Sequence, residues 1–219
     1  IYSTKANWDK IIFDPLKIIR SVIEDIEEAL LKRDQKRPFF LWTLVNTDSY
    51  IHFNGYNQAL YSALKLLDIT CQDLAEKGHT VIICSDHGQV PNIADRELGR
   101  AWDSLHSSKL CRLPVGGAGR VRWSYPYSKT EDLLLEKTSK LLGSEAIVLH
   151  RDDLEKYNLL KHNSYLKNRT GEIVTIALGD KFPITDYMLD IVYEHGSILP
   201  EEMIVPLACL LYTSPSPRD

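Results

Sequence analysis

The chain has 219 residues, of which 44% are hydrophobic and 26% charged, values ordinary for a globular protein with a sizeable core. They exclude collagen-like, disordered and disulfide-scaffold proteins. Acidic residues outnumber basic ones 30 to 26, giving a net charge of −4, so the basic excess that general nucleic-acid binding requires is missing. The longest apolar runs, such as 81–84, are too short to cross a bilayer, and no transmembrane segment is expected.

Both ends of the chain look cut. The sequence starts with Ile1 rather than Met, so we expect the natural start, with any signal peptide, to lie upstream. The compartment stays open, with a lean toward the cytoplasm. Residues 209–219 read like the in-frame translation of a sequencing adapter, or alternatively like a Ser/Pro-rich tail, and are expected to be unstructured. Residues 1–208 would then form a partial α/β domain.

Three cysteines remain when that tail is set aside, at positions 71, 84 and 111. They lie far apart and lack the C-x-x-C spacing of a zinc ribbon, and they do not form the pattern of a disulfide framework. Cys84 lies in an apolar strand pattern, which predicts a small buried hydrophobic residue.

The first predicted elements are a helix and a buried strand. Asp14 followed by Pro15 is typical of a helix start, and apolar residues recur on one helical face at positions 16, 19, 23, 26 and 30. The basic stretch 32–37 and Pro38 end this helix. Residues 39–45 are continuously apolar, the pattern of a strand buried on both faces.

A second helix and strand complete a βαβ unit. The helix, 56–77, carries an apolar stripe at positions 60, 64, 67, 71 and 74, and Gly78 is its expected C-cap. An apolar strand follows at 80–84. We therefore expect the strands 39–45 and 80–84 to be parallel and joined by a right-handed crossover.

The pattern is weaker beyond residue 90. Residues 91–119 predict a long polar excursion near a sheet edge. Further strands are expected at 120–124, 146–149, 171–178 and 204–208, a helix at 130–142, and a helical turn at 152–157. No internal repeat or linker composition interrupts the chain, so we expect one layered α/β architecture.

Polar clusters follow both strands of the βαβ unit. Asp48 and His52 come after the first strand, and Asp86 and His87 after the second. The carboxyl ends of parallel strands meet at one sheet edge, so these four side chains are expected to converge. Mixed carboxylate and imidazole ligands suit Zn²⁺ or a similar metal. The structural alternative is that Asp48 caps a helix and that Asp-His-Gly is turn chemistry.

Three motifs carry a resemblance to a known family. They are Asp48-x-x-x-His52-x-x-Gly, then Ser-Asp86-His87-Gly-Gln, then His195-Gly-Ser with the Pro-Glu-Glu-Met segment that follows it. Across residues 39–207 this order resembles the alkaline phosphatase superfamily, and within it the type I phosphodiesterase/nucleotide pyrophosphatase family. The resemblance implies an α/β fold with a largely parallel sheet between helices.

The same resemblance implies two divalent metal ions, zinc with manganese as the alternative. Asp48, His52 and His195 would hold one ion, and Asp86 and His87 the other. The implied activity is phosphoester hydrolysis, of the phosphodiesterase or nucleotide pyrophosphatase type, on a small phosphate ester or nucleotide. Two alternatives stay open, namely a phosphatase-like domain of phage-defence systems and a non-catalytic binding module. Retention of every candidate ligand argues against the binding module, since clustered ligands without metal repel one another.

The family also places an Asp and a Ser or Thr nucleophile upstream of the first motif, and nothing in 1–37 matches them. We therefore expect a C-terminal fragment, incomplete at its N-terminus and inactive alone, whose catalytic nucleophile is unknown. Smaller departures are Ile51 and Tyr56 in place of the family's Gly and Pro, and Ser197 in place of its second Gly.

Other polar side chains receive structural interpretations. Arg120 and Arg122 are within reach of a phosphate, but a solvated strand face is the preferred interpretation. The histidines without a matched motif are expected at the surface, at positions 79, 106, 150 and 162. Four polar residues lie close enough to the motifs in sequence to orient the ligands, and an equal alternative is that they are ordinary turn residues. They are Asn46, Thr47, Asn54 and Gln89.

Overall fold

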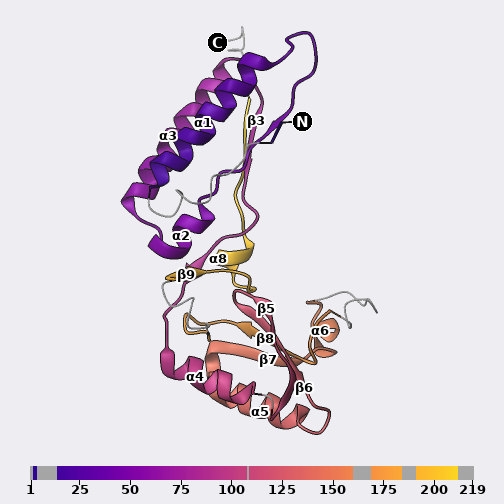
Figure 1. Cartoon of the computed structure of the whole chain (residues 1–219). Helices are drawn as coiled ribbons and strands as arrows, with labels where there is room; N and C mark the ends of the chain where they lie inside the picture. The colour runs from indigo at the N-terminus through magenta and orange to yellow at the C-terminus, as the bar shows by residue number, and fades with distance from the viewer. Residues whose placement is uncertain (1, 4–13, 108, 160–168, 184–190, 212–219) are drawn as a thin grey trace, which may run out of the picture. The chain divides into compact units, whose positions relative to one another are not determined.

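The computed structural model describes residues 2–3, 14–107, 109–159, 169–183 and 191–211. The chain divides into two compact units (Figure 1). Unit 1 comprises residues 1–86 and 205–219, and unit 2 comprises residues 87–204. No linker composition in the sequence marks this division. Among the described residues, no helix has the length and apolar character needed to span a bilayer.

Unit 1 contains two long helices that pack side by side (Figure 1). Helix α1 spans Pro15–Lys32 and α3 spans Gln58–Glu76, close to the predicted ranges. Each begins at a side-chain cap, because Asp14 Oδ1 accepts from the Leu16 N–H at 3.1 Å and Asn57 Oδ1 from the Leu60 N–H at 3.1 Å. The buried residues of these two helices include Ile19, Val22 and Ile26 of α1 and Leu60 and Ala63 of α3.

Helix α3 ends at a glycine, as predicted. Gly78 has a φ of +86°, and the N–H of His79 donates to the Leu74 carbonyl at 3.0 Å. This is the hydrogen bonding of a Schellman motif. The motif favours glycine at this position because glycine has no Cβ to clash in the left-handed conformation. The apolar stripe of α3 differs from its prediction at Leu64, which is 37% exposed, while Ala63 and Ala75 are buried.

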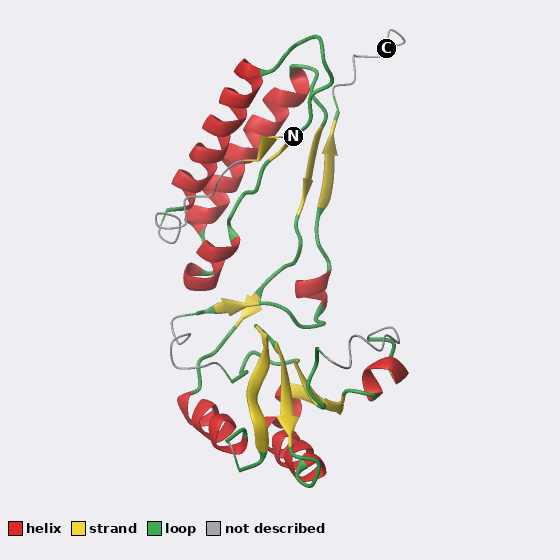
Figure 2. Ribbon diagram, turned by 45° about the vertical axis from the view of Figure 1, so that its right-hand side comes forward, coloured by secondary structure: helices red, strands yellow, loops and turns green. Residues whose placement is uncertain are grey.

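The strands of unit 1 differ from the predicted parallel pair. Strand β2 spans only Leu41–Trp42 and pairs in parallel with β1, Tyr2–Ser3. Strand β3, Val81–Cys84, pairs antiparallel with β10, Leu207–Leu210 (Figure 2). In the part of the chain that the structure describes, β2 and β3 share no ladder. Strand β10 also extends through Cys209 and Leu210, the first residues of the segment predicted to be unstructured.

Cys84 is exposed, and the prediction of a buried residue there was wrong. The four apolar residues of β3 alternate between partly buried and exposed, and Ile82 is 64% exposed. Helix α3 contacts both β3 and β10, so the face of this ribbon that packs on the helix is the less exposed one. Apolar composition alone does not distinguish a strand covered on one face from a strand covered on both.

Unit 2 is built on a four-stranded antiparallel sheet in the order β5-β6-β8-β7. The strands span Cys111–Ala118, Val121–Pro126, Ile173–Ala177 and Ala146–His150 respectively. All five residues of β8 are buried. The α/β class is therefore confirmed, but the sheets are richer in antiparallel pairing than the predicted, largely parallel arrangement.

Helices cover the sheet of unit 2 on both faces. Helix α4, Arg96–Leu105, and α5, Glu131–Leu142, pack on one face, where the core residues are Trp102, Leu134, Leu142, Ile173 and Ala177. The 3₁₀ helix Gly143–Glu145 leads into β7. Helix α6, Asp153–Lys156, packs Leu154 on Val174 and Ile176, which point to the other face because side chains alternate along β8.

The predicted excursion at 91–119 was wrong, because this segment holds both α4 and β5. Asp95 caps α4 by accepting from the N–H groups of Glu97 and Leu98, each at 3.0 Å. Its inner face carries the buried Trp102 and the partly buried Leu98 and Leu105. These residues are four and three positions apart, which is a helical spacing that the prediction of an excursion overlooked.

Two short strands and a helical turn complete unit 2. Strand β4, Val90–Pro91, pairs antiparallel with β9, Tyr193–Glu194. Helix α8 spans Pro200–Met203. The second motif precedes β4, and the third begins directly after β9 and includes α8, so the pairing of β4 with β9 brings His87 and His195 to the same end of the short ladder.

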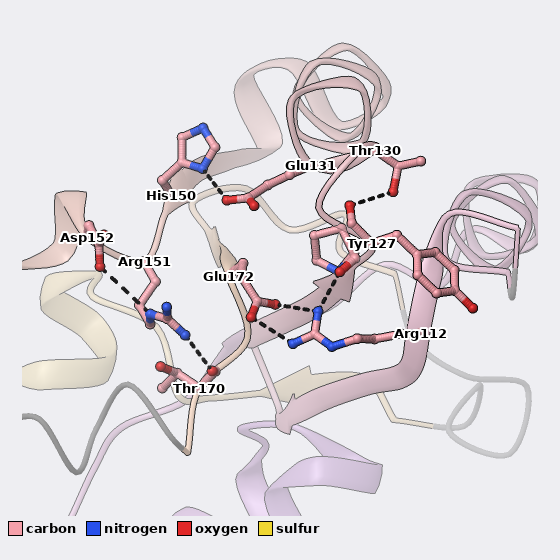
Figure 3. A network of polar contacts seen from close by, with 10 residues as sticks. Arg112, Tyr127, Thr130, Glu131, His150, Arg151, Asp152, Thr170 and Glu172 are labelled. Atoms are coloured by element: carbon pink, nitrogen blue, oxygen red, sulfur yellow. Dashed lines mark hydrogen bonds and ion pairs between the residues drawn. The ribbon is translucent and has the colours of Figure 1, made fainter.

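A polar network reinforces unit 2 between β5, β8 and the adjoining loops (Figure 3). Arg112 makes a two-pronged contact with Glu172, at 3.0 and 2.7 Å, and also donates to the Pro126 carbonyl. Burial opposes ionisation of Glu172, but the hydrogen bonds and charge of Arg112 outweigh it and lower the pKa of that carboxyl. The pair is partly exposed, so its contribution to stability is about 1 kcal/mol or less.

His106 is buried, although the sequence predicted a surface residue. Its Nδ1 donates to the Trp102 carbonyl at 2.8 Å, and its ring packs on the Trp102 ring. Nε2 is buried without a hydrogen-bond partner. Burial lowers the pKa of His106 from its ordinary value of 6.5, and the bond to Trp102 offsets only part of that effect. His79 and His150 are partly exposed, and His162 lies outside the described residues.

We expect His106 to make the chain less stable in mild acid. Because folding favours its neutral ring, the unfolded chain binds the proton first, and stability falls as pH drops below 6.5. His106→Phe removes this titration while keeping a ring beside Trp102. The unfolding free energy, measured by urea denaturation, should therefore fall more for the wild type than for the variant between about pH 7.5 and about pH 5. Parallel pH profiles would contradict this assignment.

Candidate metal centre

Unit 1 brings together the carboxylate and the imidazole of the first motif. Both lie on the short helix α2, Asp48–Asn54, where Asp48 is the first residue and His52 comes one turn later. His52 Nε2 is 3.4 Å from Asp48 Oδ1. The side chain of His52 is 14% exposed and that of Asp48 is 43% exposed. The predicted helical spacing is confirmed, since residues four apart lie on one helix face.

Helix α2 is fixed against the start of α3 by its own buried residues. Tyr50 is buried, and Asn57 Nδ2 donates to its hydroxyl oxygen at 2.9 Å. The same Asn57 caps α3, so one side chain joins the two helices. At the other end, Asn46 Oδ1 accepts from the Ser49 N–H at 3.4 Å, the contact of an ordinary turn or cap residue at the start of the helix.

Unit 2 brings together the histidines of the other two motifs. The antiparallel pairing of β4 with β9 places Val90 opposite Glu194, and His87 and His195 flank that short ladder. Their rings are stacked, with centroids 3.6 Å apart and an interplanar angle of 12°. Both side chains are partly exposed. Two imidazoles from distant parts of the sequence thus lie face to face.

Glu194, which the sequence places beside His195 in a Glu-His-Gly cluster, is a further candidate ligand outside the predicted set of five. It is buried, its Oε1 accepts from the backbone N–H of His195 at 3.0 Å, and it lies 3.9 Å from His195 Nε2. A carboxylate beside an imidazole either shares a metal with it or orients it. The only sequence signal was its adjacency to His195, which does not distinguish a ligand from an ordinary strand residue.

Asp86 lies two residues after the end of β3 and is exposed. The predicted ligands are therefore found as the Asp48–His52 pair in unit 1, the His87–His195 pair in unit 2, and Asp86 at the end of unit 1. The pair in unit 1 offers carboxylate oxygen and imidazole nitrogen, and the pair in unit 2 offers imidazole nitrogen, all donor types that bind divalent transition metals.

Arg120 is not on a solvated strand face, and that prediction was wrong. It is fully buried, and its Nε donates to Glu202 Oε1 at 3.1 Å. Arg122 differs, because its guanidinium donates to the Gly117 carbonyl at 3.1 Å. Ser197, the departure from the family pattern, is buried and donates its N–H to the same Glu202 oxygen at 2.8 Å. Arg120 and Ser197 therefore both bind the same oxygen of Glu202, and Ser197 lies in the loop that follows His195.

No protein-family model matches the chain, and no curated protein matches its sequence. Solved structures do match. Murine ectonucleotide pyrophosphatase/phosphodiesterase 5 superposes with a TM-score of 0.60 at 18% identity, over 86% of this chain and 51% of that one. The human form of that protein superposes with a TM-score of 0.56 at 19% identity, over 87% and 50% of the two chains.

The chain has an alkaline-phosphatase-like fold. A bacterial structure gives the same result, since phosphonoacetate hydrolase from Sinorhizobium meliloti 1021 superposes with a TM-score of 0.59 at 18% identity. It covers 92% of this chain and 52% of that one. The resemblance predicted from the motifs is thus confirmed for the fold. The chain spans about half the length of these alkaline-phosphatase-like structures.

Proposed function

We propose that this chain contributes the metal-binding residues of a phosphoester hydrolase of the phosphodiesterase or nucleotide pyrophosphatase type. The observation that carries the proposal is the pairing of motif residues within each unit, Asp48 with His52 and His87 with His195. The shared fold with a nucleotide pyrophosphatase/phosphodiesterase and with a phosphonate hydrolase supports the same class of chemistry.

The donor set fits two divalent ions. Asp48, His52 and His195 would hold one ion, and Asp86 and His87 the other, with Glu194 as an additional ligand or as the partner of His195. Oxygen and imidazole donors without thiolates suit zinc and also manganese.

The chain's own residues perform binding and orientation in this scheme. The imidazoles must be neutral to act as ligands, so metal affinity should weaken in mild acid. Asp48 and Asp86 supply the negative charge that offsets the cations. Bound divalent ions supply positive charge beside a phosphoryl group, which favours displacement at phosphorus. The nucleophile, in this proposal, is a Ser or Thr outside these 219 residues.

The test uses zinc binding by the 219-residue chain and hydrolysis by the natural protein that contains it. Zinc affinity is measured by competition with a chromogenic chelator, and hydrolysis with bis(p-nitrophenyl) phosphate, with p-nitrophenyl phosphate and phosphonoacetate as comparison substrates. We expect tight zinc binding by the chain, preferential cleavage of the diester, and loss of cleavage on chelation. Zinc or manganese added back should restore the activity.

Each other outcome favours a different function. Preferential cleavage of the monoester would favour a phosphatase, and zinc binding without hydrolysis of any substrate would favour a non-catalytic binding module. Hydrolysis that survives complete removal of metal would overturn the proposal.

A further inference from the structure

Three backbone segments of unit 2 converge on Glu202. The N–H of Gly88, next to His87, donates to the Glu202 carbonyl at 2.9 Å. The N–H of Ser197 donates to Glu202 Oε1 at 2.8 Å, and Arg120 Nε donates to the same oxygen at 3.1 Å. Glu202 thus connects the loop that follows His87 with the loop that follows His195.

The backbone of Arg120 makes hydrogen bonds to His195 and to the central strand of the sheet. Its backbone N–H donates to the carbonyl oxygen of His195 at 3.0 Å, and its carbonyl accepts from the Ala177 N–H on the central strand β8 at 2.9 Å. Ser197 Oγ also donates to the Ala177 carbonyl. The carbonyl of His195 and the loop after it are therefore anchored to the sheet through Arg120 and Ser197.

Stability alone gives no reason for an ion pair at this place. The side chains of Arg120 and Glu202 are 0% and 1% exposed, and Arg120 Nη1, Nη2 and Glu202 Oε2 have no hydrogen-bond partner in the structure. Desolvation of two charges commonly cancels their attraction, and apolar replacements of both are often neutral or stabilising. The pair instead provides conformational specificity. A buried charge requires specific hydrogen-bond partners and so restricts the conformation of the backbone around it.

We propose that Arg120 and Glu202 are positioning residues that hold the His87 and His195 rings face to face, so that metal binds to preorganised imidazoles. The inference rests on the proposed function for its metal, and on the hydrogen bonds of unit 2 for its geometry. Groups that orient metal ligands typically change metal affinity by 10- to 100-fold when they are removed.

The test variant is Arg120→Met combined with Glu202→Leu, which removes the pair without leaving a single buried charge. The matched control is Arg112→Met combined with Glu172→Leu, which removes the partly exposed pair of the same unit. We expect the first variant to bind zinc about 10- to 100-fold more weakly than the wild type, and the control to keep wild-type affinity. Thermal unfolding should stay within about 4 °C of wild type for both.

A second readout needs no metal. Stacked imidazoles shift the NMR signals of each other's ring protons, so the ring signals of His87 and His195 in the metal-free chain report the stack. We expect the shift in the wild type and the control, and its loss in the Arg120/Glu202 variant. Wild-type zinc affinity and unchanged ring shifts in that variant would overturn the inference, whatever the protein's activity.

The two readouts separate this inference from the proposed function. A wild-type chain that shows stacked rings but binds no zinc contradicts the function, while loss of the stack in the variant still supports the positioning role. If the double variant does not fold, Glu202→Gln takes its place. That variant keeps an acceptor for Ser197 but removes the charge that holds Arg120, so we expect the same direction of change in zinc affinity and ring shifts.

Discussion

Zinc binding should fall by more than about 100-fold when His195 is replaced by asparagine, because removing a ligand has a larger effect than removing a group that orients one. His87→Asn should do the same, since the two rings lie 3.6 Å apart and belong to one proposed centre. Affinity is measured on the 219-residue chain at about pH 7.5, where an ordinary histidine is neutral. Hydrolysis of the diester by the natural protein should be lost in parallel.

His150→Asn is the control for these ligand variants. His150 lies in the same unit, is partly exposed, and has its Nδ1 3.1 Å from a Glu131 carboxylate oxygen, so it also joins a carboxylate and an imidazole. It belongs to none of the three motifs, and we expect wild-type zinc affinity. Equal losses for His150→Asn and His195→Asn would show non-specific binding by surface histidines and would contradict the centre proposed here.

Gly119→Ala should destabilise the chain far more than Gly143→Ala. Both glycines have a φ of +53°, so an added Cβ meets backbone strain at each position. A Cβ at Gly143 has no atom within 4 Å, whereas a Cβ at Gly119 would lie 2.2 Å from the carbonyl oxygen of His195. Overpacking of this kind adds about 1–3 kcal/mol.

Urea denaturation of the two variants checks this difference. We expect the unfolding free energy to fall further for Gly119→Ala than for Gly143→Ala, by the cost of the overlap, about 1–3 kcal/mol. Relief of the overlap at Gly119 would move the His195 carbonyl away from the Arg120 N–H, so zinc affinity should also fall in that variant only. Equal destabilisation would mean that the segments do not approach so closely.

The helices of unit 1 were predictable because their signals are local. Asp14 and Pro15 fix the start of α1, and Gly78 fixes the end of α3, each through hydrogen bonds or backbone angles within a few residues. The strands were less predictable. Nothing local states that β3 pairs with β10 in antiparallel register, because that choice depends on contacts with a segment far along the chain.

The candidate metal centre shows the same division. Asp48 and His52 could be paired from their spacing, because one helical turn brings them together. His87 and His195 were linked only by their motifs, and it is the β4–β9 ladder that places them face to face. The role of Arg120 was misjudged because strand alternation says which side a residue faces, but not whether a distant carboxylate covers that side.

By itself, the sequence determined the α/β fold class, the long helices and the residue types of the candidate ligands, since composition, caps and motif residues act over short stretches of chain. Only the tertiary structure decided the antiparallel sheets, the stacking of two imidazoles and the buried Arg120–Glu202 pair. These features join segments distant in sequence, and their energies depend on burial and on the partner that folding supplies, which no local pattern specifies.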